Sequence, residues 1–243
     1  MSDVIQVWEI PLQVSENALQ AYAQCLSSDE YVRAERFRFS KDRRRFIVSR
    51  GTLRHLLSGQ FGCLPQAIEF CYGKYGKPSV ESAGVAMRSI AQRAAASDCS
   101  HGNAFNFNVS HSGELALCAL GNQHRVGIDI EKFKTIQRLD SLMERCLSAQ
   151  EQANVQAADK PAEAFLRRWT CKEAYLKAIG VGLSQSMKTV EVAMNPPRFV
   201  CVPDDCEEGW TLHTIAVPEG YAGALVVAGS VPVKLNQWVH PNV

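Results

Sequence analysis

The order of helix-like and strand-like segments is the feature that most restricts the fold of this chain. One alternating segment at 4–10 precedes helical patterns over 15–62, and residues 105–131 then read as three strands of a meander. Two more helical segments and a second group of strands follow. Both halves therefore hold helices and strands without the regular alternation of a doubly wound sheet, which predicts an α+β protein with an N-terminal half (1–122) and a C-terminal half (123–243). The later helices are expected at 137–157 and 161–179, and the later strands at 187–194, 198–202, 210–217 and 221–230.

The composition narrows the class of protein. With 243 residues, of which 46% are hydrophobic, the chain can bury a substantial core, and its net charge of +1 excludes a general preference for polyanions or membranes. The nine cysteines form no C-x-x-C pair, which disfavours zinc sites and a disulfide framework and favours a reducing cytoplasm. Cys118 and Cys171 are expected in the core, and neither a signal peptide nor a transmembrane helix is expected.

The segment "FLRRWTCKEAYLKA", residues 165–178, predicts a helix that places charges beside an apolar face. Phe165, Leu166, Trp169 and Leu176 share that face, while Lys172, Glu173 and Lys177 lie on it or along its edges. Buried charges are costly unless they are paired or bind a metal. Two readings remain open, a binding site around Glu173 or ordinary solvated pairs on the helix surface.

The segment "VGIDIE", residues 126–131, predicts a strand that projects Asp129 and Glu131 from one face. Like charges so close repel each other unless something offsets them, and Mg²⁺ binds such carboxylates readily. Gly127 on the same face permits close approach of a ligand or backbone. The alternative is an exposed strand end with two solvated acids.

Two further segments carry groups that can contact phosphate. Ser110 and His111 follow a predicted strand in "NVSHSG", although a loop histidine is often an ordinary surface residue. Arginines crowd residues 33–54, and Lys74 and Lys77 lie in "YGKYGKP". The arginine cluster could be a solvated helix face, a nucleic-acid patch or a polyphosphate site, and the low net charge disfavours nucleic acid.

Taken together, these segments predict phosphoryl-group chemistry performed by positioning and charge stabilisation. The predicted metal ligands are Asp129, Glu131 and Glu173. The predicted phosphate contacts are Arg50, Lys77, His111 and Lys177.

Here the sequence resembles the 4′-phosphopantetheinyl transferases. "VGIDIE" followed by "RRWTCKEAYLKAIGVGL" matches the family signature Gly-[Ile/Val]-Asp and Trp-x-x-Lys-Glu-x-x-x-Lys. "YGKP", "FNVSHSG" and "RRRFIVSRGTLR" match further family motifs upstream. The length and the two halves are similar to the surfactin-synthetase-activating (Sfp-type) subgroup, rather than to the short trimeric holo-acyl-carrier-protein synthases.

The resemblance implies a pseudo-twofold pair of α+β halves with the active site between them, in a monomeric, cytoplasmic, Mg²⁺-dependent enzyme. It implies transfer of 4′-phosphopantetheine from coenzyme A to a serine of an apo acyl or peptidyl carrier protein, with release of adenosine 3′,5′-bisphosphate. The N-terminal half would contribute to coenzyme A binding. The C-terminal half would hold the magnesium site, the catalytic helix and the carrier docking surface, with no role for nucleic acid or a membrane.

The resemblance also implies roles for individual residues. Asp129, Glu131 and Glu173 fall on the magnesium ligands, and Glu173 also falls on the base for the carrier serine. Lys177 contacts the reacting phosphate, and His111 helps to neutralise phosphate charge. Coenzyme A contacts are expected at Arg33, Arg50, Lys77, Ser110, His111, Lys172 and Lys177, with the role of Lys172 the least defined.

Some features depart from the family pattern or leave alternatives open. Residues 79–104 form a longer insertion than expected, and Glu30 stands where some relatives carry a basic residue. The carrier could dock on the helix after residue 131 if Met143 stays exposed near Lys134 and Arg138, or that apolar row could be entirely core. The rival functions are a non-catalytic carrier-binding relative, a nucleic-acid-binding protein and a Mg²⁺-dependent phosphoesterase.

Overall fold

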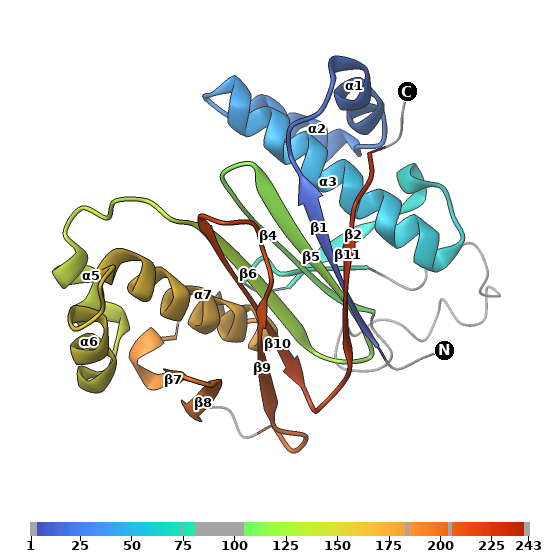
Figure 1. Cartoon of the computed structure of the whole chain (residues 1–243). Coiled ribbons are helices and arrows are strands. Elements are labelled where there is room, and N and C mark those ends of the chain that lie inside the picture. Colours follow the sequence, from blue (N-terminus) through green and yellow to red (C-terminus); the bar gives the residue numbers. More distant parts are fainter. Residues whose placement is uncertain (1–3, 74, 81–104, 183–184, 204–205, 241–243) are drawn as a thin grey trace. The chain divides into compact units, whose positions relative to one another are not determined.

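The computed structural model describes residues 4–240 except 74, 81–104, 183–184 and 204–205 (Figure 1). Helices and strands occur in both halves of the chain, so the predicted α+β class is confirmed. The predicted insertion at 79–104 and Lys74 lie almost entirely outside the described residues. The fold divides into two compact units, which are described separately below.

The first unit comprises Met1–Glu9, Asn106–Gly113 and Leu117–Asn236, and the second comprises Ile10–Phe105, Glu114–Ala116 and Gln237–Val243. Each unit therefore takes segments from distant parts of the sequence. The boundary between the two units does not lie at residue 122, because the strands on both sides of this residue belong mainly to the first unit. The functional division into halves 1–122 and 123–243 stays a prediction.

The second unit is built around a long helix whose ends match the sequence signals. Its elements within the described residues are α1 (Glu16–Gln24), α2 (Ser28–Glu35), α3 (Ser40–Phe61), η1 (Pro65–Ala67) and the antiparallel pair β2 (Phe70–Tyr72) and β3 (Pro78–Val80). Ser15 caps α1 by accepting a hydrogen bond from the Ala18 N–H, and Gly62 ends α3 at φ 65°. The N-cap of α3 is Phe39, which makes no capping hydrogen bond through its side chain.

The first unit contains most of the strands. One sheet has the order β11-β1-β5-β4 and a second has the order β6-β10-β9, while β7 and β8 form a separate hairpin. The strands are β1 (Ile5–Pro11), β4 (Asn106–Ser112), β5 (Leu115–Asn122), β6 (Val126–Lys132), β7 (Glu191–Met194), β8 (Pro197–Cys201), β9 (Trp210–Ile215), β10 (Tyr221–Ala228) and β11 (Val233–Gln237).

The third strand of the predicted meander has a different partner. β6 pairs antiparallel with β10, nearly one hundred residues later, and not with β5. The expectation of a simple meander over 105–131 was therefore wrong. Local alternation identifies each strand correctly but carries no information about a partner so distant in sequence.

Among the described residues, the first unit also holds the α-helices α5 (Leu139–Cys146), α6 (Ala149–Gln156) and α7 (Pro161–Ile179). The single helix expected at 137–157 is two helices, because Ser148 opens α6 with a capping box to Glu151. Met143 is 2% exposed and packs in the core, so of the two alternatives for Met143 the buried one is confirmed and the exposed docking contact is excluded.

The core of the first unit confirms the apolar face predicted for residues 165–178. Phe165, Leu166 and Leu176 are buried in one cluster, and Trp169 packs against it. Cys118 and Cys171 are buried as expected, and the cysteines in the described part of the chain are free thiols. Among the described residues, no helix combines the length and apolar character needed to cross a bilayer.

Candidate functional site

The two carboxylates of β6 lie under α7 in the first unit. Asp129 and Glu131 project from one face of the strand, and the residues paired with them on β10 are Ala224 and Ala222. These small neighbours leave the carboxylates room above the sheet. The alternation predicted for residues 126–131 is thereby confirmed, with Ile128 and Ile130 buried on the opposite face.

Asp129 is almost fully buried and is held by two donors. Its Oδ1 accepts hydrogen bonds from Ser110 Oγ at 2.7 Å and from Lys177 Nζ at 2.6 Å. Lys177 Nζ also donates to Ser110 Oγ at 2.9 Å, so the three groups form a closed triangle. The second oxygen, Oδ2, is buried with no hydrogen-bond partner among the described residues. One face of this carboxylate therefore remains available to a cation.

The folded protein disfavours the ionised forms of Glu131 and Glu173. Burial raises the pKa of the Glu131 carboxyl, and the nearby charge of Asp129 raises it further, against a hydrogen bond from Ser112 Oγ at 2.9 Å. Burial is also the main cause of the raised pKa of Glu173, where Lys177 opposes and Asp129 and Glu131 add to the shift. The charge of Asp129 thus acts on both glutamates, and the charge of Glu131 acts on Glu173, as expected of groups that share a site.

Gly127 explains how α7 comes close enough to carry Glu173 and Lys177 to this site. A Cβ atom at Gly127 would lie 2.0 Å from Ala174 O and 2.3 Å from Ala178 N, closer than any real contact. Only glycine therefore allows the backbone of α7 to rest directly on β6. The close approach predicted at this residue occurs, and the approaching group is the helix backbone.

The polar row on β4 holds the outer edge of β6. Asn108 Oδ1 accepts from Ile128 N at 2.8 Å, and Ser112 Oγ accepts from Lys132 N at 3.1 Å. Ser110, between them, reaches Asp129. Asn108 and Ser112 were not predicted from the sequence, although residues two apart on a strand share a face and this pattern could have found them. His111 is exposed, and by the same alternation lies on the other face of β4.

Lys172 has different surroundings from the other predicted site residues. Its side chain is 0% exposed, and its ammonium donates to Glu151 Oε2, Cys146 O and Met187 O at 2.6, 2.8 and 3.1 Å. An ammonium has three N–H donors, so all of them are used. The placement speaks against the predicted contact between Lys172 and coenzyme A.

One predicted residue of the second unit, Arg50, lies beside a buried acid. Glu30 lies 3.4 Å from Arg50 Nε and 2.7 Å from Arg54 Nε. Arg54 also donates to two backbone carbonyls, whereas Arg50 Nη1 is buried without a hydrogen-bond partner among the described residues. Arg50 therefore keeps an unused donor, and Arg54, which was not predicted, is a structural residue.

Two other predicted contacts also belong to the second unit. The Arg33 guanidinium lies 5.2 Å from the centre of the Phe46 ring on an exposed part of α2. Lys77 is half-buried next to the start of β3. Both residues belong to the second unit, whereas Asp129, Glu131 and Glu173 belong to the first.

The residues present fit a hard divalent cation, although they do not form a ready-made cage. Within the described residues, no group of three or more histidine, cysteine or acidic side chains is arranged to hold a metal. Asp129 Oδ2 is buried without a hydrogen-bond partner among the described residues, and burial raises the pKa values of Glu131 and Glu173, so a bound cation would stabilise the charged forms of these carboxylates. Oxygen donors of this kind suit Mg²⁺, which keeps several waters or phosphate oxygens.

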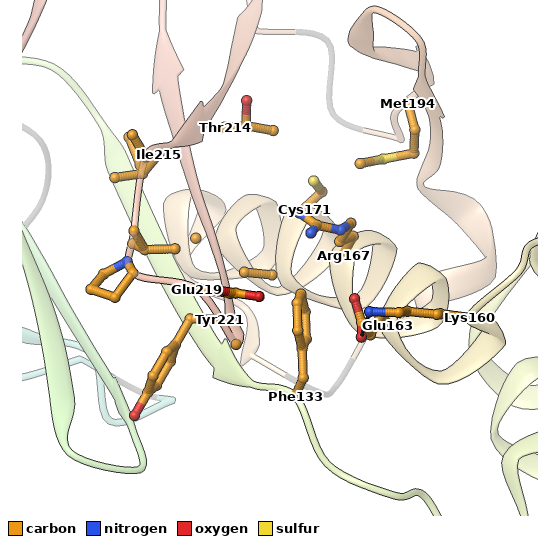
Figure 2. Close-up of a pocket in the computed structure, with 16 residues that line it drawn as sticks. Phe133, Lys160, Glu163, Arg167, Cys171, Met194, Thr214, Ile215, Glu219 and Tyr221 are labelled. Carbon is orange, nitrogen blue, oxygen red and sulfur yellow. Dashed lines mark ion pairs between the residues drawn. The ribbon is translucent and has the colours of Figure 1, made fainter.

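A separate concavity of about 680 Å³ lies in the first unit beside the N-terminal half of α7 (Figure 2). The Lys160–Glu163 ion pair at 3.0 Å and the Arg167 guanidinium, 4.9 Å from the Phe133 ring centre, line one side. None of its lining residues belongs to the predicted site. We therefore assign the candidate site to the three carboxylates and Lys177, and not to this concavity.

Two family models match this chain. Residues 125–226 match a family model described as the 4′-phosphopantetheinyl transferase superfamily, and residues 11–123 match one described as 4′-phosphopantetheinyl transferase, N-terminal. The chain is 36% identical over 231 residues to 4′-phosphopantetheinyl transferase HetI of Nostoc sp., with 94% of this chain and 90% of HetI covered.

Two further similarities are more distant. The chain is 27% identical over 221 residues to 4′-phosphopantetheinyl transferase Sfp of Bacillus subtilis, with 90% of this chain and 88% of Sfp covered. A crystal structure of a holo-(acyl-carrier-protein) synthase from Bacillus anthracis in complex with CoA (3′,5′-ADP) is 29% identical. That match covers 43% of this chain and 96% of the other, with a TM-score of 0.37.

Proposed function

Because this chain belongs to the 4′-phosphopantetheinyl transferase family, we propose that it transfers 4′-phosphopantetheine from coenzyme A to a serine of an apo acyl or peptidyl carrier protein. The observation that carries the proposal is the meeting of Asp129, Glu173 and Lys177 at one site, on the motifs of the family. The similarity to Sfp over most of both chains supports the Sfp-type subgroup.

Asp129, Glu131 and Glu173 would hold Mg²⁺ in this proposal. The support is the unpartnered Asp129 Oδ2 and the raised pKa values of Glu131 and Glu173, caused mainly by burial and increased by the charge of Asp129. A bound Mg²⁺ would supply positive charge that offsets the negative charge of the coenzyme A pyrophosphate and the charge that develops on the leaving bisphosphate.

Glu173 is the proposed base for the carrier serine. A raised pKa makes this carboxylate a better proton acceptor near neutral pH than an ordinary glutamate. The serine Oγ would give its proton to Glu173 and form a bond to the phosphorus that bears pantetheine. The bond from that phosphorus to the bridging oxygen breaks, and adenosine 3′,5′-bisphosphate leaves with the electron pair.

Lys177 is the proposed contact to the reacting phosphate. Its ammonium is partly exposed and already positioned by Asp129 Oδ1 and Ser110 Oγ. A cation held in advance need not reorganise when charge develops on the phosphate. Ser110 thus supports the lysine, and His111 is a proposed additional phosphate contact.

Coenzyme A would also be contacted by residues of the second unit. Arg50 is the best supported of these residues, because its buried Nη1 has no hydrogen-bond partner in the described part of the chain. A planar guanidinium with an unused donor is suited to phosphate oxygens. Arg33 and Lys77 are proposed as further contacts. Matches to two consecutive family models in one chain support a monomer that holds both parts.

Mass spectrometry of an apo carrier protein tests the proposed function. Incubation with the protein, coenzyme A and Mg²⁺ should add one phosphopantetheine group per carrier, and the addition should be absent with EDTA. A carrier whose serine is replaced by alanine is the control. Hydrolysis of coenzyme A without modification of any carrier would instead identify a phosphoesterase, and binding without modification a non-catalytic relative.

A further inference from the structure

Lys172 and Glu151 form a buried ion pair that ties five segments together. Lys172 Nζ joins α7 to Glu151 at the start of α6, to Cys146 O at the end of α5 and to Met187 O in η3 (Met187–Thr189). Glu151 in turn accepts from Ser148 N at 2.8 Å through Oε2. It accepts from Val192 N at 3.0 Å through Oε1. Both charges are thus compensated by hydrogen bonds within the protein.

The pair anchors α7 next to the residues that carry the proposed chemistry. Lys172 directly precedes Glu173, and successive side chains on a helix point about 100° apart. Fixing the direction of Lys172 therefore fixes the rotation of the helix about its axis, and with it the direction of Glu173. The opposite side of α7 rests on β6 at Gly127. The helix is held from two sides, and one of them depends on this ion pair.

We propose that Lys172 and Glu151 are positioning residues for the transfer reaction. They set the rotation of α7 that presents Glu173 and Lys177 beside Asp129, and Lys172 does not touch coenzyme A. The inference rests on the proposed function, because it assigns a role within that reaction. It also explains why a lysine of the family motif is fully enclosed by protein groups.

The test compares kinetic constants of Lys172→Met and Glu151→Gln with those of the parent protein. Methionine keeps most of the side-chain volume but makes none of the three hydrogen bonds. A small rotation of α7 misplaces the base, so kcat should fall by about 10–100-fold. The KM values for coenzyme A and for the carrier should stay within about threefold, because no contact to either substrate is removed.

Arg168→Met is the matched control. Arg168 is also a buried cation on α7, but within the described residues its hydrogen bond goes to Ala164 O of its own helix, and it feels the charge of Glu151 without a hydrogen bond to it. Its loss should lower the melting temperature without changing kcat by more than about threefold. Comparing Lys172→Met with Arg168→Met separates the effect of a general loss of stability from the effect of a misplaced Glu173.

Three results would overturn the proposal. A higher KM for coenzyme A at unchanged kcat in Lys172→Met would make the lysine a ligand contact. Equal losses of kcat in Lys172→Met and Arg168→Met would leave only a general structural role. If Lys172→Met does not fold, Glu151→Gln decides, and parental kcat in that variant contradicts the proposal. Failure of the parent protein to modify any apo carrier is a separate result, which removes the proposed function itself.

Discussion

The carboxylates of the candidate site differ at the level of single residues. Asp129 is 4% exposed and anchors two donors, Ser110 and Lys177. Glu173 is half-buried, and no hydrogen bond to it is found within the described part of the chain. Asp129 therefore has both a structural and a proposed chemical role, while Glu173 carries a charge that costs stability.

Replacing each carboxylate by alanine should separate these roles. Both Asp129→Ala and Glu173→Ala should abolish transfer. Asp129→Ala should also lower the free energy of unfolding by about 1–3 kcal/mol, because Ser110 and Lys177 lose a buried acceptor. Glu173→Ala should leave stability unchanged or improved. Denaturant unfolding and carrier modification measure the two effects, and Glu163→Ala, a change of an acid elsewhere on α7, is the control for both.

The raised pKa of Glu173 predicts how stability varies with pH in EDTA. A carboxyl whose folded pKa exceeds its unfolded value favours folding at low pH, and this contribution is lost as pH rises through the folded pKa. Glu173→Gln should therefore melt at a higher temperature than the parent at pH 8, by on the order of 2 °C. The difference should shrink as pH falls toward 4.5. A difference that does not vary with pH would contradict the assigned shift.

The sequence predicts which residues belong to the candidate site better than it predicts which residues they contact. Asp129, Glu131, Glu173 and Lys177 follow from strand alternation, helix periodicity and motif resemblance. Ser110 was expected to contact coenzyme A and lies hydrogen-bonded to Asp129 and Lys177. Nothing local in the sequence states that β4 lies beside β6, because that neighbourhood depends on tertiary packing.

At the scale of elements, the contact between α7 and β6 depends on one absent side chain. Gly127→Ala should force α7 away from the strand, because the added Cβ would meet backbone atoms that cannot rotate aside. The cost should be about 1–3 kcal/mol or more of stability, with loss of most transfer activity.

Gly59→Ala is the control for this prediction. Gly59 lies in α3, and nothing would lie within 4 Å of a Cβ added there. Alanine favours a helix interior by about 0.8–1.0 kcal/mol relative to glycine, so this variant should be more stable and fully active. Thermal melts and turnover of both variants give the comparison, and a stable, active Gly127→Ala would disprove the close approach.

Elements with strong local signals were predicted well. α1 (Glu16–Gln24), α3 (Ser40–Phe61) and α7 (Pro161–Ile179) occur where periodicity and end signals place them. The break between α5 and α6 follows from Ser148 and Glu151, a capping box that lay inside an uninterrupted helical pattern. β11 (Val233–Gln237) was missed, because a short edge strand beside β1 has little periodicity of its own.

At the scale of the whole molecule, the two compact units are interleaved in sequence. The first unit uses Met1–Glu9, Asn106–Gly113 and Leu117–Asn236, and the second unit uses Ile10–Phe105 together with Glu114–Ala116 and Gln237–Val243. Cutting the chain at residue 122 would remove β1, β4 and β5 from the unit that contains β6 and α7.

We therefore expect that residues 123–243 expressed alone do not fold cooperatively. Asn108, Ser110 and Ser112 would be missing, and with them the groups that hold β6 and Asp129. Far-UV circular dichroism and denaturant unfolding of the fragment are the measurement, with the full chain as the reference. A cooperative transition in the fragment would show that the C-terminal half is an independent folding unit.

The side chains along the outer edge of β6 also bear on how the molecule behaves among its own copies. β6 ends the β6-β10-β9 sheet, so its outward amide and carbonyl groups could otherwise template a strand from another chain. Asn108, Ser112 and Lys177 occupy these groups at Ile128 and Lys132. The same side chains that organise the candidate site thereby block intermolecular strand addition, so loss of Asn108 threatens solubility as well as catalysis.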